Sequence, residues 1–355
     1  MTTGNASNQG FGPATTVAEV GEHKLISLIG EQLKAEASST DFESALDKPV
    51  DVEVEVDSGD DAAVLNLGSD RVVVSTDVLV EERHFRVRWS SGIDVGVKVA
   101  AANLADIAAM GASPVALVVA LVLPGKTPLS WVLDLARGLA REAARAGAIV
   151  VGGDISGGEA ISVTATAIGR LETEAKAIRL DGAQVGDQVA IAGRLGWSEA
   201  GLTILSRGFS SPKVIVEAHR QPSPDYVAAL AAAKDAHAMT DISDGLVADL
   251  AHIARASNVA IEADYSLLPQ SDELVQASAA LSVELSGWLL GGGEDHGFLA
   301  TFPSSAQLPT GFTKVGTVVP RTEGTAIVSV LGPEGVEGSG GEPMDLRPFR
   351  GYVHY

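Results

Sequence analysis

Residues 92–124 read GIDVGVKVAAANLADIAAMGASPVALVVALVLP. The alanine-rich part, 92–110, predicts a helix, and Gly111 ends it. An apolar run then extends from Pro114 to Pro124, which is far too short to span a bilayer and is typical of a fully buried strand. A long helix joined to a buried strand by a short glycine turn indicates an α/β architecture.

The segments on either side extend this pattern into a first domain over residues 17–172. It follows a polar stretch at 1–16 that lacks the basic and apolar regions of a signal peptide and is expected to be a disordered tail. Because both helices and tight turns connect its strands, a mixed sheet is expected. The other helices are predicted at 17–36 and 128–147, and the other strands at 50–56, 62–67, 71–77, 148–154 and 161–170.

A second α/β domain is expected over residues 173–355. The predicted fold class is therefore α/β with mixed α+β sheets, arranged in two domains. Strands are predicted at 186–193, within HAMTDISDG (237–245), after the glycine turn of GWLLGGGEDHGFLATF (287–302) and at 314–319. Helices are predicted after a loop at 194–201 and at 222–237 and 244–257, and a loop at 331–345.

The composition excludes several classes of function. The chain has 355 residues, enough for about two domains. It carries 25 Lys and Arg against 46 Asp and Glu, a formal net charge of −21. This excess of carboxylates argues against nucleic acid and anionic lipid as partners, since both select basic surfaces. The absence of cysteine excludes disulfides, thiolate metal sites and a cysteine nucleophile. A cytoplasmic enzyme is expected.

The acidic residues are concentrated in turns that follow apolar strands. Any one such turn is ordinarily only a turn or a helix cap. Together they are expected to meet at one edge of a sheet, where ligands bind in α/β folds. Because so many carboxylates repel one another without cations, the pattern favours several Mg²⁺ ions around a polyphosphate. The turns are Gly59–Asp61, Ser75–Asp77, Gly152–Asp154, Asp241–Gly245 and Gly293–Asp295, and Asn103 and Asp106 pair on one helical face.

Glycines in these turns, at 152–153 and 291–293, let backbone N–H groups approach phosphate oxygens closely. The sequence has no Walker A motif, no kinase glycine-rich loop and no dinucleotide fingerprint. A bound nucleotide is therefore expected to be held mainly through metal. One basic cluster, RHFRVR at 83–88, either contacts a substrate phosphate or is a solvated strand. Four histidines lack metal-ligand spacing and are expected at the surface: His23, His219, His237 and His252.

In this order, the motifs resemble those of the thiamine-monophosphate kinase family. That family belongs to a superfamily with aminoimidazole ribonucleotide synthetase, selenophosphate synthetase and a hydrogenase-maturation protein. The resemblance covers nearly the whole chain, and its longer motifs are specific in combination. The matching pieces are GEHKLISLI (21–29), SGDDAAVL (58–65), VSTDVLVEERHF (74–85), KVAAANLADIAAMGASP (98–114), VGGDIS (151–156), TDISDGLVADLAHIA (240–254), GGGEDHGF (291–298) and GYVHY (351–355).

The resemblance implies a fold and a set of site residues. The first domain would bind ATP and Mg²⁺ and pair with its twin in a homodimer, and the second would close over nucleotide and substrate. Asp77 and Asp154 would be the most critical residues, with no covalent nucleophile. The implied metal ligands are Asp61, Ser75, Thr76, Asp77, Asp106, Asp154, Asp241 and Asp244; the ATP contacts are Gly153, Asp154, Arg179 and Ser243; and the substrate contacts are His84, Glu294 and Tyr352.

The implied reaction transfers the γ-phosphoryl group of ATP directly onto thiamine monophosphate and gives thiamine diphosphate, the last step of its biosynthesis. Two alternatives remain open: another ATP-dependent synthetase of the superfamily, and a non-catalytic protein that binds Mg-nucleotide. The completeness of the carboxylate set favours an enzyme. A two-metal phosphohydrolase is disfavoured, because it expects histidine among its ligands and these turns contain almost none.

Overall fold

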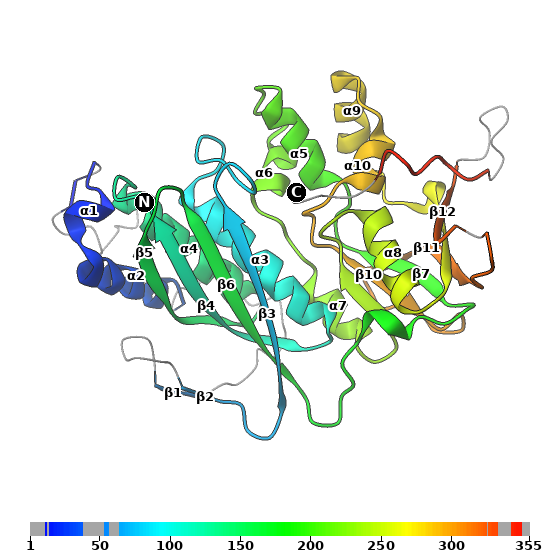
Figure 1. Cartoon of the computed structure of the whole chain (residues 1–355), viewed down its shortest axis with the longest axis horizontal. Coiled ribbons are helices and arrows are strands. Elements are labelled where there is room, and N and C mark those ends of the chain that lie inside the picture. The colour runs from blue at the N-terminus through cyan, green and yellow to red at the C-terminus, as the bar shows by residue number, and fades with distance from the viewer. Residues whose placement is uncertain are drawn as a thin grey trace. The chain divides into compact units, whose positions relative to one another are not determined.

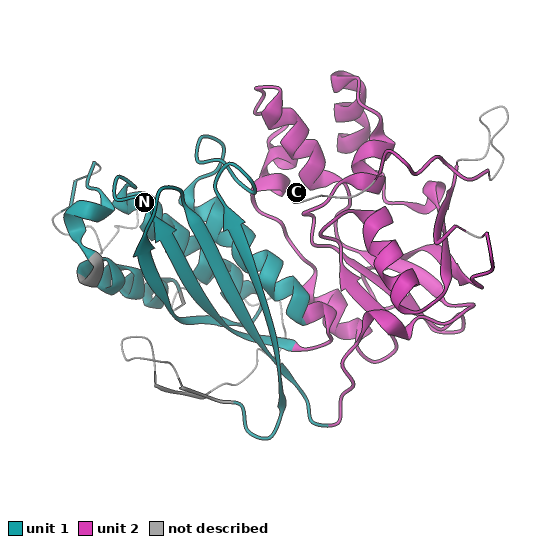
Figure 2. Cartoon of the chain, viewed as in Figure 1, with its two compact units in different colours: residues 1–107, 113–173 teal, residues 108–112, 174–355 magenta. Residues whose placement is uncertain are grey.

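The structure is a computed structural model that describes residues 11–12, 14–37, 53–56, 64–324, 326–332 and 342–349. The chain forms two compact units (Figure 2). Unit 1 comprises Met1–Ile107 and Ser113–Thr173, and unit 2 comprises Ala108–Ala112 and Glu174–Tyr355.

Unit 1 is built on a four-stranded sheet in the order β3-β6-β4-β5. Strand β6 (Ser162–Leu171) pairs antiparallel with β3 (Arg71–Val80) and with β4 (Ser113–Leu123), whereas β5 (Ile149–Gly157) runs parallel to β4. The sheet is therefore mixed, and β3 and β5 form its two edges. The remaining elements are α1 (Val17–Val20), α2 (Glu22–Ala37), α3 (Gly92–Ala109), α4 (Leu129–Arg145) and an antiparallel pair, β1 (Glu53–Val56) with β2 (Val64–Asn66).

Helices α3 and α4 cover one face of this sheet (Figure 1). Two glycines let the helices approach each other closely. A Cβ atom on Gly96 would lie 2.2 Å from the carbonyl oxygen of Leu135, and one on Gly138 would lie 2.2 Å from that of Ile93. Since both neighbours are backbone atoms, a side chain at either position would force the helices apart.

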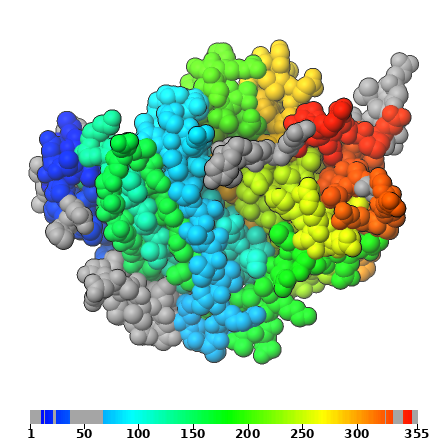
Figure 3. Space-filling view, in the orientation of Figure 1, coloured from blue at the N-terminus to red at the C-terminus, as the bar shows by residue number. Residues whose placement is uncertain are grey.

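The opposite face of the sheet exposes apolar side chains. In β3 the exposed fractions of Val72, Val74 and Val78 are 53%, 60% and 45%, and in β4 that of Val118 is 37%. The register places these residues on one face, because Thr166 of β6 pairs both with Thr76 and with Val118. Figure 3 shows these strands at the surface of the molecule. A sheet face with several exposed valines is typical of an interaction surface.

Unit 2 is built on a six-stranded sheet in the order β12-β9-β11-β7-β10-β8. Only β12 and β9 are parallel neighbours in it; the other pairings are antiparallel. The strands are β7 (Gln188–Ala192), β8 (Ala238–Asp241), β9 (Ala260–Asp264), β10 (Phe298–Phe302), β11 (Phe312–Val319) and β12 (Val328–Leu331). The helices are α5 (Trp197–Ser206), α6 (Lys213–Arg220), α7 (Tyr226–Ala232), α8 (Leu246–Ala256), α9 (Asp272–Leu281) and α10 (Leu285–Gly291).

The predicted fold class is confirmed, whereas some local predictions are wrong. Only Tyr226–Ala232 of the predicted helix at 222–237 is helical, and the loop predicted at 194–201 contains the start of α5. The stretch expected to be a glycine turn forms helix α10 up to Gly291, because its Trp288, Leu289 and Leu290 are buried and tertiary packing overrides the low helix propensity of glycine. The apolar run from residue 114 forms β4, and none of the described helices is long and apolar enough to cross a bilayer.

Candidate functional site

The first group of predicted site residues lies where β3 meets α3 in unit 1. The hydroxyl of Ser75 donates to Oδ2 of Asp106 at 2.6 Å. Asn103 is fully buried; its Nδ2 donates to the carbonyl of Val99 at 2.8 Å, and its Oδ1 accepts the backbone N–H of Asp77 at 2.9 Å. Asn103 therefore fixes the backbone of β3 beside two carboxylates, while the side chain of Asp77 stays exposed.

Thr76 lies between these residues but points to the other face of the sheet. Its hydroxyl donates to the carbonyl of Ala165 at 2.9 Å and lies 3.1 Å from the hydroxyl of Thr166. Successive side chains of a strand alternate between faces, so the hydroxyl of Thr76 does not join those of its neighbours.

His84 follows β3 in a tight turn. Its Nδ1 accepts the backbone N–H of Val80 at 3.0 Å, and the buried Lys98 donates to its carbonyl oxygen at 3.2 Å. Because Nδ1 is the acceptor, the neutral imidazole carries its proton on Nε2. His84 can therefore present an N–H donor to a phosphate oxygen.

Gly153 and Asp154 lie in the edge strand β5. A Cβ atom on Gly153 would lie 1.8 Å from the carbonyl oxygen of Val119 in β4, so only glycine fits there. Asp154 pairs with Ala120 in the register and is exposed. The close approach of the two backbones positions Asp154 at the sheet edge.

The expectation that all carboxylate turns meet at one sheet edge is wrong. Ser75–Asp77 and Gly152–Asp154 lie inside β3 and β5, which form opposite edges of the sheet three strand spacings apart, about 14 Å. The register also places Asp77 and Asp154 on opposite faces. The prediction failed because it assumed that each motif ended its strand, whereas both strands continue past it.

The second group lies in unit 2, where strands β8 and β10 are antiparallel neighbours and bring two distant motifs together. Beyond the strands, the N–H of Glu294 donates to the carbonyl of Ser243 at 2.9 Å, and that of His296 donates to the carbonyl of Ile242 at 3.0 Å. A Cβ atom on Gly293 would lie 2.3 Å from the carbonyl oxygen of Ser243. Glycine therefore allows the ISDG and GGGED segments to run in contact.

Acidic residues are dense around these two segments. Asp249 in α8 is buried, and its Oδ2 accepts the N–H of Gly245 at 3.1 Å and that of Asp244 at 3.3 Å. Burial and the nearby charges of Asp241 and Asp244 raise the pKa of Asp249 to about 8. Without a cation, it is therefore unfavourable for all of these carboxyl groups to be ionised at once.

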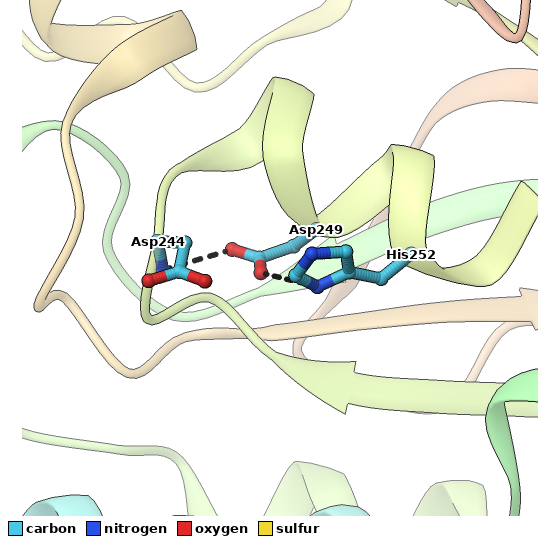
Figure 4. Close-up of side chains that lie close together, drawn as sticks. All are labelled: Asp244, Asp249 and His252. Atoms are coloured by element: carbon cyan, nitrogen blue, oxygen red, sulfur yellow. Dashed lines mark hydrogen bonds and ion pairs between the residues drawn. The ribbon is translucent and has the colours of Figure 1, made fainter. Parts of the chain in front are cut away.

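A metal ion fits this donor set. Asp244, Asp249 and His252 each offer a ligand atom, and these atoms lie within 4.8 Å of one another (Figure 4). Carboxylate oxygens are the ligands that Mg²⁺ prefers. Burial and, after it, the charges of Asp241 and Asp244 raise the pKa of Asp249, and a bound cation would offset both effects. Asp249 was not among the residues predicted from the sequence, although an acid inside the apolar helical run LVADLAHI is a visible signal of a buried carboxylate.

Two further acids extend this region: Asp295, which ends the predicted turn Gly293–Asp295, and Glu199, which was not predicted as a site residue. Asp295 is buried and accepts the backbone N–H groups of Gly196 and of Ser198, the latter at 2.8 Å, so it ties the GGGED segment to the start of α5. Burial raises the pKa of Asp295 to about 6. Burial, with the nearby Glu294 and Asp295, raises the pKa of Glu199 to about 7.

The raised pKa of Glu199 predicts a pH-dependent stability. The folded chain binds this proton more tightly than the unfolded chain, so the contribution of Glu199 to stability falls as pH rises from about 4.5 to about 7 and stays low above that. Glu199→Gln removes the ionisation. We expect its melting temperature, relative to the unchanged protein, to be higher at pH 8 than at pH 5.5. The exposed Glu217→Gln in α6 is the control, and an equal difference at both pH values for Glu199→Gln would contradict the assignment.

The remaining predicted residues have different surroundings, and two of them lie outside the described residues. Arg179 is exposed and forms a bidentate ion pair with Asp181 at 2.9 and 2.7 Å. Asp61 and Tyr352 lie outside the described residues. In the basic cluster, Arg86 and Arg88 both pair with Glu82 and lie over the ring of Trp89. The surface prediction for His219 is wrong: it is buried, with Nδ1 3.1 Å from the hydroxyl of Ser198.

Two family models match the chain. The N-terminal domain of AIR synthase related proteins matches residues 59–171, and the C-terminal domain of the same proteins matches residues 184–329. The two α/β units with their carboxylate-bearing glycine segments thus define an AIR synthase related protein.

Individual relatives show to which family within this class the chain belongs. The thiamine-monophosphate kinase of Mycobacterium tuberculosis is 43% identical over 278 residues, which cover 78% of this chain and 82% of the relative. That of Corynebacterium glutamicum is 37% identical and covers 89% and 91%. The solved structure of AaThiL complexed with AMPPCP and TMP is 32% identical with a TM-score of 0.70, and covers 92% of this chain and 98% of that one. The chain belongs to the thiamine-monophosphate kinase family.

Proposed function

We propose that this chain transfers the γ-phosphoryl group of ATP onto thiamine monophosphate and forms thiamine diphosphate and ADP. The observation that carries the proposal is the similarity, over 92% of this chain, to AaThiL, whose structure holds AMPPCP and TMP. The proposal agrees with the carboxylate-rich segments of both units and with the lack of a dedicated nucleotide motif in the sequence.

Several Mg²⁺ ions are part of the proposal. When bound, they would screen the repulsion between two anionic substrates and stabilise the charge on the transferred group. The oxygen-rich donor set and the raised pKa of Asp249 support a cation in unit 2. The proposed ligands are Asp61, Ser75, Thr76, Asp77, Asp106, Asp154, Asp241 and Asp244.

The remaining site residues are proposed to bind and orient the two substrates. The Nε2–H of His84 would donate to the phosphate of thiamine monophosphate, since its Nδ1 is already engaged by Val80. Glu294 and Tyr352 would contact the same substrate. Gly153, Asp154, Arg179 and Ser243 would contact ATP, with glycine at 153 leaving the backbone accessible to a phosphate oxygen.

No strong base and no phosphorylated enzyme are needed for this reaction. The acceptor is a phosphate oxygen that is already ionised at neutral pH, so the barrier depends on positioning and on charge neutralisation. The role of the chain's own residues is to align donor and acceptor and to exclude water.

We also propose a homodimer that forms through the open face of the sheet in unit 1. Under this proposal residues 17–172 bind ATP and Mg²⁺ and dimerise, and residues 173–355 close over nucleotide and substrate. The exposed valines of β3 and β4 support a second copy as the occupant of that face. Pairing of two chains would also let carboxylates at opposite sheet edges serve sites that both chains complete. The cytoplasm is the proposed compartment.

Val74→Glu tests the dimer. A carboxylate on this face would be buried without a partner, so we expect the variant to sediment as a monomer where the unchanged protein sediments as a dimer. Val185→Glu is the control, since Val185 is 56% exposed in unit 2 and Val74 is 60% exposed. A Val74→Glu variant that sediments as a dimer would exclude this face.

The activity is tested by incubating the protein with Mg-ATP and thiamine monophosphate and separating the thiamine phosphates. We expect thiamine diphosphate in amounts equal to ADP. ATP turnover without thiamine diphosphate would favour another synthetase of the superfamily, and nucleotide binding without turnover would favour a non-catalytic protein.

A further inference from the structure

A buried histidine contacts one of the proposed metal ligands in unit 2. Nδ1 of His296 lies 2.8 Å from Oδ2 of Asp241, and the two residues are only 7% and 5% exposed. They are 55 residues apart in the sequence and come together because β8 and β10 are antiparallel neighbours. His296 was not among the site residues predicted from the sequence, although it lies within the motif GGGEDHGF.

The chemistry of the two side chains fixes the donor and the acceptor in the hydrogen bond between His296 and Asp241. A carboxylate only accepts hydrogen bonds, so Nδ1 of His296 must carry the proton and donate it to Oδ2 of Asp241. That bond leaves Oδ1 of Asp241 out of the interaction with the histidine. A carboxylate ligand whose second oxygen is held by a hydrogen bond keeps one orientation. Removing such a hydrogen-bonding partner commonly weakens metal binding about 10–100-fold.

The backbone of His296 supports a specific role for its side chain. Its φ angle is +52°, a left-handed conformation in which glycine would be unstrained. The conformation is held by the hydrogen bond from the N–H of His296 to the carbonyl of Ile242. Residues other than glycine in such a conformation are typical of functional sites, where the surrounding contacts hold the backbone in its strained conformation.

We propose that His296 is a positioning residue that holds the carboxylate of Asp241 in the orientation that presents Oδ1 to a divalent metal bound with the nucleotide. The inference rests on the proposed function, in which Asp241 is a metal ligand. A purely structural role would make His296 important for folding and not for metal affinity.

The chain offers variants that separate these roles. His296→Asn keeps an N–H donor where Nδ1 now lies, and asparagine tolerates positive φ better than most residues. His296→Gly removes the donor and relieves the backbone strain, and His296→Ala is a second donorless variant. Asp241→Asn removes the ligand charge itself. A thermal melt of each variant reports whether it is folded.

The measurement is Mn²⁺ binding to the full chain with AMPPCP, followed by the electron paramagnetic resonance signal of free Mn²⁺. We expect Asp241→Asn to lose one class of Mn²⁺ site, His296→Gly and His296→Ala to weaken that class about 10–100-fold, and His296→Asn to stay within about threefold of the unchanged protein.

The outcomes separate the two proposals. If Asp241→Asn binds Mn²⁺ normally, Asp241 is not a ligand, and both its proposed role and the positioning role of His296 fall. If Asp241→Asn loses the site but a folded donorless variant binds Mn²⁺ normally, the metal site stands and the positioning role of His296 is overturned. Loss of the site in a folded His296→Asn variant would also overturn it, because the donor is retained there.

Discussion

Asp154→Asn lowers the rate of thiamine diphosphate formation at least about 10²–10³-fold, the usual effect of removing one electrostatic contact to a transferred charged group. Asp154 is exposed in the edge strand β5, so its loss should leave the fold intact. We expect the melting temperature of the metal-free variant to match that of the unchanged protein. Turnover with saturating Mg²⁺, ATP and thiamine monophosphate, together with a thermal melt, measures both effects.

Glu159→Gln is the matched control, because Glu159 is an exposed acid in the turn that follows β5 and its loss changes the charge equally. It should keep normal turnover. Asp77→Asn, at the opposite sheet edge, should resemble Asp154→Asn. Near-normal activity of either aspartate variant at saturating Mg²⁺ would show that its metal assignment is wrong.

Gly153→Ala should damage both stability and turnover. The added Cβ atom would lie 1.8 Å from the carbonyl oxygen of Val119, so β4 and β5 must separate. Overpacking of this kind costs about 1–3 kcal/mol in the free energy of unfolding. The shift also displaces Asp154, the next residue, so turnover should fall about as far as in Asp154→Asn. A thermal melt and the product assay measure the two losses.

Gly152→Ala, one residue earlier, is a strict control. A Cβ atom there meets nothing within 4 Å, and the backbone needs no positive φ. We expect this variant to be as stable as the unchanged protein. If the two alanine variants melt at the same temperature, the close contact between Gly153 and β4 does not exist in solution.

The sequence predicts the fold well where one segment carries a strong local pattern. The helix and strand within 92–124 and the glycines at 152–153 are clear from spacing and composition alone. Helix α10 was missed because its glycines argue against a helix, and only the burial of Trp288 and its neighbours explains it. Tertiary packing of this kind cannot be seen in a single sequence.

The candidate site could be predicted as a set of residues but not as an arrangement. Each carboxylate motif is visible in the sequence, yet the order β3-β6-β4-β5 places Asp77 and Asp154 at opposite edges, and strand order is not written in any one motif. The contact between His296 and Asp241 depends likewise on the pairing of β8 with β10. Burial is the largest cause of the raised pKa values of Asp249 and Glu199, and it depends on how the whole domain packs.

The most direct test of direct phosphoryl transfer is a single-turnover experiment with ATP labelled at the γ-phosphate, Mg²⁺ and thiamine monophosphate, quenched at successive times. We predict that label passes from ATP to the terminal phosphate of thiamine diphosphate, with one ADP formed per labelled product and no label on the protein at any time. Label held on the protein before product appears, or released as inorganic phosphate without thiamine diphosphate, would contradict direct transfer to thiamine monophosphate.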